Sequence, residues 1–131
     1  MDWDGLVLNN LRIFEVDIMA VVFTPLSMIK GDTKYIGVKL TGLTETLTSA
    51  TFSVKNSLED AESLFEKTLG DGIEQDSENP ELCQVRIDQD DTADLPDLDL
   101  PAVTYFYRLS IEANGDKFSP LVGTLEVVKG A

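Results

Sequence analysis

The densest group of side chains that could do chemistry is an acidic run in the second half of the chain. Its aspartates are Asp88, Asp90, Asp91, Asp94, Asp97 and Asp99. Calcium prefers several carboxylate and carbonyl oxygens on a flexible loop, so Asp88, Asp90, Asp91 and Asp94 are candidate metal ligands. The EF-hand order is missing, because no glycine follows the third acidic position and no glutamate closes a loop of the right length. We therefore favour a solvated acidic turn whose side chains cap local backbone N–H groups, and we expect no cofactor.

Catalysis has few routes in this chain, because histidine is absent. That absence removes the usual general base and proton shuttle, together with the Ser-His-Asp and Cys-His nucleophile systems. A P-loop, a dinucleotide-binding fingerprint and zinc-ligand spacing are also missing from the sequence. A carboxylate-pair enzyme would need a cleft with two acids roughly 5 to 10 Å apart, and the acidic residues here cluster in turns where solvation explains them. We therefore expect the protein not to be an enzyme, and we rank a carboxylate enzyme third among the functions considered below.

Cys83 is the sole cysteine, so an intramolecular disulfide cannot form. It lies in the strand-like run 82–87, and nothing nearby in the sequence would lower its pKa. A structural position on a strand face is therefore favoured over a reactive thiol.

Two tyrosines near the C-terminus could form an aromatic binding pair if they were exposed. Tyr105 and Tyr107 alternate with Leu109 and Ile111, however, which predicts that all four face the core. The expected exposed aromatic residues are Phe106, on the opposite face of the same strand, and Trp3. Either of these could mark an interface.

Strand signals alternate with turn signals along most of the chain, at the spacing of an all-β sandwich. The expected strands are residues 21–24, 26–29, 35–41, 50–55, 63–69, 73–75, 82–87, 103–113 and 121–128. Segment 56–69 also contains good helix-forming residues, so we expect a loop or a helical turn at 58–61 before its strand. Gly70-Asp71-Gly72 and Asn114-Gly115 are strong turn signals, and the second predicts a tight hairpin.

The acidic loop that runs into the tyrosine strand also indicates a particular fold. A loop holding Asp-Thr-Ala ahead of such a strand is typical of the corner of an immunoglobulin-like sandwich, where a tyrosine hydroxyl bonds back to loop backbone. The predicted fold is an all-β, immunoglobulin-like antiparallel β-sandwich of about seven to nine strands, with one short helical turn.

The chain has 131 residues, which is enough for one domain without disulfides. Residues 1–18 form an N-terminal appendage in our division, and residues 19–131 form the sandwich domain. The appendage has two explanations. It is an extra strand or short helix packed on the domain, or translation begins at Met19, because Glu15-Val16 can be encoded by a purine-rich ribosome-binding sequence.

Ten basic and twenty-four acidic residues give a net charge of −14. This charge repels phosphate backbones, so nucleic-acid binding is not expected, whereas a basic partner or a divalent cation is compatible. No apolar run approaches the ~20 residues that a bilayer crossing needs, and the N-terminus is acidic where a signal peptide would be basic. Neither a membrane partner nor secretion by that route is expected.

Motifs recurring in a set order suggest a family. The motifs are a Lys-Gly-Asp-Thr turn, an Ala-Thr-Phe strand, a Gly-Asp-Gly turn, a strand ending in Asp-Thr before the loop, a Tyr-x-Tyr-x-Leu strand and a Gly-x-Leu-x-Val close. This order, over residues 21–128, resembles the N-terminal immunoglobulin-like domain of phage baseplate upper proteins and related prophage tail proteins of Gram-positive bacteria. Longer relatives continue into a C-terminal extension that engages receptor-binding proteins, and the loop 94–101 is longer here than the usual connection.

The resemblance implies a virion structural role without catalysis, and it carries over no functional residue. The predicted function is a phage or prophage tail or baseplate module that mediates protein–protein assembly. Its expected partners are other tail or baseplate proteins or a second copy of the chain, in a virion assembled in the bacterial cytoplasm. The alternative is a carbohydrate- or ligand-binding β-sandwich module, with or without assistance by calcium. It would need solvent-facing aromatics with acidic residues beside them.

Overall fold

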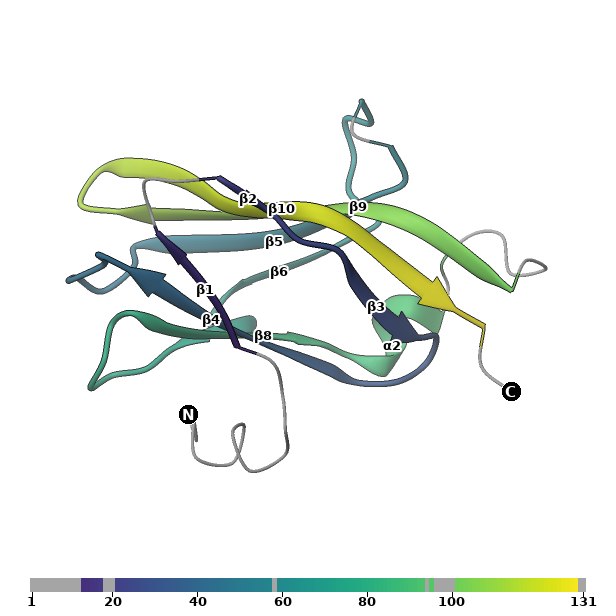
Figure 1. Cartoon of the computed structure of the whole chain (residues 1–131), viewed down its shortest axis with the longest axis horizontal. Coiled ribbons are helices and arrows are strands. Elements are labelled where there is room, and N and C mark those ends of the chain that lie inside the picture. The colour runs from purple at the N-terminus through teal and green to yellow at the C-terminus, as the bar shows by residue number, and fades with distance from the viewer. Residues whose placement is uncertain (1–12, 18–20, 58, 94, 96–100, 130–131) are drawn as a thin grey trace.

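The computed structural model describes residues 13–17, 21–57, 59–93, 95 and 101–129, and almost all of them belong to or connect β-strands (Figure 1). In chain order the elements are β1 (Ile13–Asp17), β2 (Val22–Phe23), β3 (Leu26–Ile29), β4 (Lys34–Thr41), β5 (Ser49–Lys55), β6 (Phe65–Leu69), β7 (Gly72–Gln75), β8 (Leu82–Ile87), α2 (Gln89–Ala93), β9 (Ala102–Ala113) and β10 (Asp116–Val128).

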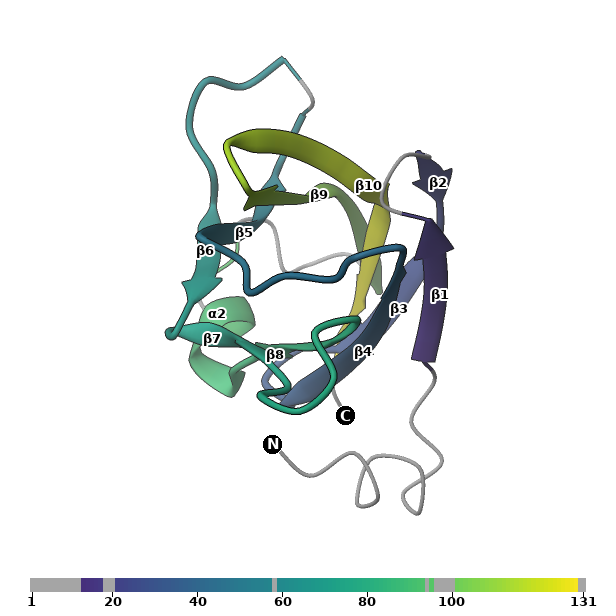
Figure 2. The same cartoon turned by 90° about the vertical axis from the view of Figure 1, so that its left-hand side faces the viewer.

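The strands form one curled sheet in the order β1-β4-β8-β7-β6-β5-β9-β10-β2, and β3 also pairs with β10. Viewed from the end, β4, β8 and β7 face β5, β9 and β10 across the interior (Figure 2). The short β6–β7 pairing closes one side of this arrangement, and β1, β2 and β3 lie on the other side. The result is a nearly closed, barrel-like sheet.

The expectation of an all-β fold with one short helix is confirmed, but the sheet is barrel-like rather than clearly a sandwich. It is also mixed instead of antiparallel, because β1 runs parallel to β4, β6 to β7, and both β2 and β3 to β10. The predicted Gly-Asp-Gly turn explains the closure. Gly70 and Gly72 have φ of 87° and 99°, a backbone conformation that glycine adopts readily, and the tight turn passes the chain from one layer to the other.

The two-residue alternation of the sequence is confirmed in the long strands. The buried core includes the inward rows Ile36, Val38 and Leu40 of β4, Phe52 and Val54 of β5, Tyr105, Tyr107, Leu109 and Ile111 of β9, and Leu121, Leu125 and Val127 of β10. The predicted hairpin at Asn114-Gly115 is present, with φ of 54° and 83° at the two positions. Pairing in β10 shifts between Phe118 and Leu121, a bulge that accommodates Pro120, which has no N–H to donate.

The described residues of segment 58–61 form a turn, one of the two forms expected there. The Asp60 N–H donates to the Ser57 carbonyl over 3.1 Å, and the strand that follows is β6. A short helix that the sequence analysis did not predict, α2, lies inside the acidic run. It begins after Asp88, whose N–H donates to Asp91 Oδ2 over 2.7 Å, an arrangement like half of a capping box. This local bond outweighs the modest helix propensity of an aspartate-rich sequence.

Residues 13–17 correspond to the extra strand that we considered for the N-terminal segment. β1 pairs with β4 over five residues, and Val16 is only 3% exposed in the common core. Residues 1–12 and 18–20, Trp3 and Met19 among them, lie outside the described part of the chain. A translation start at Met19 stays a prediction.

Thr24, between β2 and β3, crosses over Gly123 of β10, and its backbone groups are hydrogen-bonded to β10 and β9. The Thr24 N–H donates to the Val122 carbonyl over 2.9 Å, and the Thr24 carbonyl accepts a 2.6 Å hydrogen bond from the Tyr107 hydroxyl. Tyr107 is paired with Gly123, where any Cβ would collide with the Thr24 carbonyl. Only glycine therefore allows the chain to pass so close over β10.

The hydroxyl of Tyr107 thus binds a segment 83 residues away in the chain. The predicted tyrosine corner, in which a tyrosine hydroxyl bonds to the loop before the strand, stays a prediction. Residues 96–100 of that loop lie outside the described part of the chain. The Tyr107 ring also stacks on Phe52, with centroids 5.2 Å apart, and burial raises the pKa of the hydroxyl. The hydroxyl therefore stays protonated and remains a donor.

We expect Tyr107→Phe to lower the free energy of unfolding by about 1 to 3 kcal/mol, because it leaves the buried Thr24 carbonyl without this donor. Urea denaturation measures the change. Tyr35→Phe is the matched control, because Tyr35 is 38% exposed, and it should stay within about 0.5 kcal/mol of wild type. Equal stabilities for the two variants would contradict the role given to the Tyr107 hydroxyl.

Candidate functional site: an ion cluster, a hollow and an apolar edge

The acidic run meets a buried lysine. Lys67, which is 8% exposed in the middle of β6, places its Nζ 2.8 Å from Asp88 Oδ2 and 2.6 Å from Asp91 Oδ2. Asp88 uses its other oxygen for Arg86, with 2.8 Å between Oδ1 and Nε. The Asp88 carboxylate therefore pairs with both Lys67 and Arg86, and the Lys67 ammonium pairs with both Asp88 and Asp91.

The electrostatics of this cluster favour the charged forms. Burial alone would lower the pKa of Lys67, but the hydrogen bonds to Asp88 and Asp91 outweigh it, and the pKa is raised. The hydrogen bond from Lys67 lowers the pKa of Asp88, with help from the charge of Arg86. The cluster is a fixed set of ion pairs that ties β6 to the start of α2.

The candidate metal ligands are thus divided. Asp88 and Asp91 come together, but around the Lys67 ammonium, while Asp90 lies exposed on α2. Asp94, Asp97 and Asp99 fall outside the described residues. Within the part of the chain that the structure describes, no group of three or more metal-ligating side chains is present.

The other predicted reactive groups are internal. Cys83 is 2% exposed, and burial raises the pKa of its thiol to about 12, which suits the predicted structural position. Tyr105 and Tyr107 point into the core as predicted, and Phe106 is half-buried beside Lys55 and Arg108 instead of fully exposed. Two features of the described surface bear on function, a hollow at Tyr35 and an apolar edge on β2 and β3.

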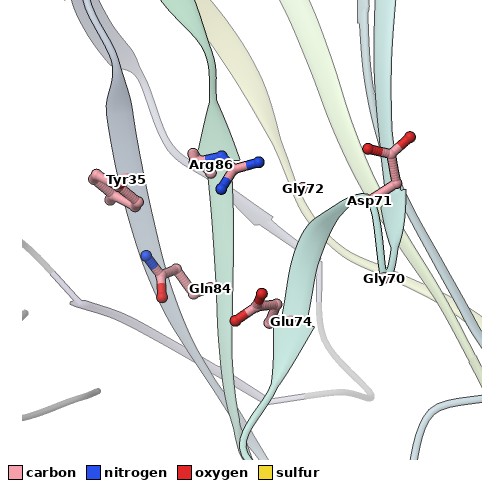
Figure 3. A pocket seen from close by; sticks show the side chains of 7 residues that line it. All are labelled: Tyr35, Gly70, Asp71, Gly72, Glu74, Gln84 and Arg86. Atoms are coloured by element: carbon pink, nitrogen blue, oxygen red, sulfur yellow. The ribbon is translucent and has the colours of Figure 1, made fainter. Parts of the chain in front are cut away.

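The hollow lies on the outer face of β4, β8 and β7 and has a volume of about 290 Å³ (Figure 3). The strand register builds it, because Tyr35 of β4 is paired with Arg86 of β8, and Glu74 of β7 is paired with Gln84 of β8. The Gly70-Asp71-Gly72 turn forms the remaining wall. The two glycines of this turn contribute no side chains to the wall, and a Cβ on Gly72 would collide with the Lys67 side chain.

Sequence reasoning missed this hollow, although a signal for it existed. Placing Ile36, Val38 and Leu40 inside places Tyr35 outside by the same alternation, and the inward Cys83 and Val85 imply an outward Gln84. What the sequence does not reveal is that β4, β8 and β7 are neighbours, because their order depends on pairing between distant segments.

The apolar edge consists of Val21, Phe23 and Ile29, which are 71%, 64% and 48% exposed. Phe23 and Ile29 share the outward face of β2 and β3, on which Pro25 and Ser27 are also exposed. Within the described structure, β2 and β3 pair only with β10, so their other side carries unpaired backbone groups. Exposed apolar side chains on a strand edge are a feature that contacts with other proteins can use.

Acidic side chains accompany this edge. Glu126 of β10 is exposed opposite Ser27 of β3, and Glu15 and Asp17 are exposed on β1, shortly before Val21 in the chain. A partner with basic residues around an apolar centre would complement this surface.

No protein-family model and no curated protein matches the chain. Among the described residues, no helix is long and apolar enough to span a membrane.

We expect Lys67→Met to lower the free energy of unfolding by about 2 kcal/mol near pH 7, below the usual loss for a fully buried pair because Asp88 and Asp91 keep some contact with water. The loss should depend on pH. The lowered pKa of Asp88 contributes stability that is present above its unfolded pKa of about 3.9 and lost as the pH falls through the folded value. The raised pKa of Lys67 contributes stability that is present below about 10.4 and lost as the pH rises through its folded value.

The gap between wild type and Lys67→Met should therefore be widest from about pH 5 to 9 and narrow on both sides. Urea denaturation across this range measures it. Lys117→Met, which removes an exposed lysine, serves as the control and should show a small gap throughout. A Lys67→Met curve that runs parallel to wild type at every pH would contradict the ion cluster.

Proposed function

We propose that this protein is a non-catalytic structural module of a phage or prophage tail or baseplate, which joins other tail or baseplate proteins through its β2–β3 edge. The observation that carries the proposal is the exposure of Val21, Phe23 and Ile29 on strands that pair with β10 alone among the described elements.

The edge favours a contact with an extended segment of another protein. Unpaired N–H and C=O groups on a strand edge can hydrogen-bond to an added strand, while apolar side chains supply affinity. Phe23 is the natural anchor, because an aromatic side chain buries 150–250 Å² when it is covered.

The charge of the protein also favours one class of partner over others. The net charge of −14 and the exposed Glu126 beside the edge disfavour a second copy of the same surface and favour a partner segment with lysine or arginine flanking an apolar centre. The absence of histidine from the sequence and the engagement of Asp88 and Asp91 by Lys67 support a non-catalytic role. The tail or baseplate location rests on the ordered motifs between residues 21 and 128.

The location is testable directly. Antibody against this protein should label the tails or baseplates of particles purified from the source strain, in negative-stain electron microscopy. Particles in which the gene is deleted are the control for non-specific label. Intact tails that contain no label would overturn the proposal.

The edge is testable with a double variant. Phe23→Ser with Ile29→Ser should reduce incorporation into particles by roughly thirtyfold, the equivalent of about 2 kcal/mol at an interface anchor. Quantitative immunoblotting of purified particles measures this loss. Leu64→Ser is the matched control, because Leu64 is also exposed, at 37%, but lies before β6 away from the edge.

Both proteins should fold, and thermal unfolding of each purified variant verifies this. Normal incorporation of the folded double variant would show that assembly uses another surface.

A further inference from the structure

We propose that the hollow at Tyr35 binds one ring of a neutral saccharide. The inference goes beyond assembly and does not depend on it, because the hollow and the β2–β3 edge use different residues. An aromatic side chain and several planar polar groups gather around one concave surface of about 290 Å³ (Figure 3).

The aromatic component is Tyr35. Its side chain is 38% exposed on the outer face of β4, although a tyrosine in a β-strand is easily buried. Saccharide rings present a face of C–H groups that packs against an aromatic ring, and the tyrosine hydroxyl adds a hydrogen-bonding group at the rim. The ring needs no rearrangement of the sheet to make this contact.

The polar side chains that line the hollow include both hydrogen-bond donors and hydrogen-bond acceptors. Gln84 offers both through its amide, Arg86 offers donors, and Glu74 and Asp71 offer carboxylate oxygens. In Figure 3 Gln84, Arg86 and Glu74 lie together on the neighbouring strands β8 and β7, and Asp71 stands on the turn next to them. Adjacent hydroxyl groups of a sugar match such paired planar groups, because each hydroxyl both donates and accepts.

Arg86 is held in place from behind. Its Nε donates to Asp88 Oδ1 over 2.8 Å, and Asp88 is itself fixed by Lys67. Since the guanidinium fork is rigid, fixing Nε also orients the two terminal nitrogens. The ion cluster therefore pre-organises one wall of the hollow, which lowers the entropy lost on binding.

Charge and size indicate the class of ligand. Two carboxylates, Asp71 and Glu74, and one guanidinium line the hollow in a protein of net charge −14, so phosphate, sulfate or acidic sugars would be repelled. The volume lies at the lower end of the range for small-molecule sites, about 300 to 1,000 Å³. One neutral ring fits this space, with the rest of a glycan extending into solvent.

The test is a titration of the isotope-labelled full chain, followed by amide chemical shifts in two-dimensional NMR spectra. The probes are glucose, galactose and N-acetylglucosamine, each raised to about 50 mM because a single shallow ring site binds weakly. At least one probe should shift the amides of residues 70–74, 84–86 and 35 in a saturable manner. Absence of saturable shifts with all three probes, or shifts confined to another surface, would overturn the proposal.

Variants sharpen the outcome. Tyr35→Ala should weaken saccharide binding up to about tenfold, whereas Tyr35→Phe should retain most of the affinity. Glu74→Gln should also weaken saccharide binding, while the other acidic residues of the protein continue to repel anions. Leu64→Ala is the control outside the hollow and should bind as wild type. Unchanged affinity in a folded Tyr35→Ala protein would contradict the assignment, as would saturable binding of inorganic phosphate at the same amides.

Failure here and failure of the proposed function remain distinguishable. Labelled tails without sugar binding would contradict the saccharide site and leave the assembly role standing. Sugar binding by a protein that is absent from tails would contradict the assembly role and leave the saccharide site standing.

Discussion

The crossing of Thr24 over Gly123 is the constraint on which the rest of this barrel-like sheet depends. A backbone carbonyl is buried between two strands, and such a group needs a donor. Tyr107 supplies it from the neighbouring strand, at the one position where a missing side chain opens the path. Because of this contact, β2 and β3 lie along β10 and bring the N-terminal part of the sheet against its C-terminal part.

Much of the fold follows from local pattern, and the differences have a common origin. The inward rows of β4, β5, β9 and β10, the hairpin at Asn114-Gly115 and the internal position of Cys83 could all be predicted, because a period of two and positive φ are local properties. The parallel pairings, the hydroxyl contact of Tyr107 with Thr24 and the hollow at Tyr35 could not, since each joins segments far apart in the chain. The helix at Gln89–Ala93 was not predicted, and at its start the Asp88 backbone N–H donates to the Asp91 carboxylate.

The charged groups that the structure describes fall into two sets, one in the ion cluster and one on the surface. Lys67, Asp88 and Asp91 neutralise one another beneath the surface, and Arg86 extends that cluster outward to the hollow. Most of the other acidic groups that the structure describes lie on the surface, where their field would favour basic partners in the proposed assembly role, and Phe23 and its apolar neighbours would supply the short-range affinity. The ion cluster and the β2–β3 edge use different residues, whereas the cluster and the hollow share Arg86.

The parallel pairing of β3 with β10 has a consequence for synthesis. Leu26 leaves the ribosome long before its partner Leu125. Until β10 has been synthesised, β2 and β3 lack the strand with which they pair. Closure of this sheet therefore waits for β10, and a chaperone or an assembly partner that binds β2 and β3 in the meantime would protect the nascent chain from aggregation.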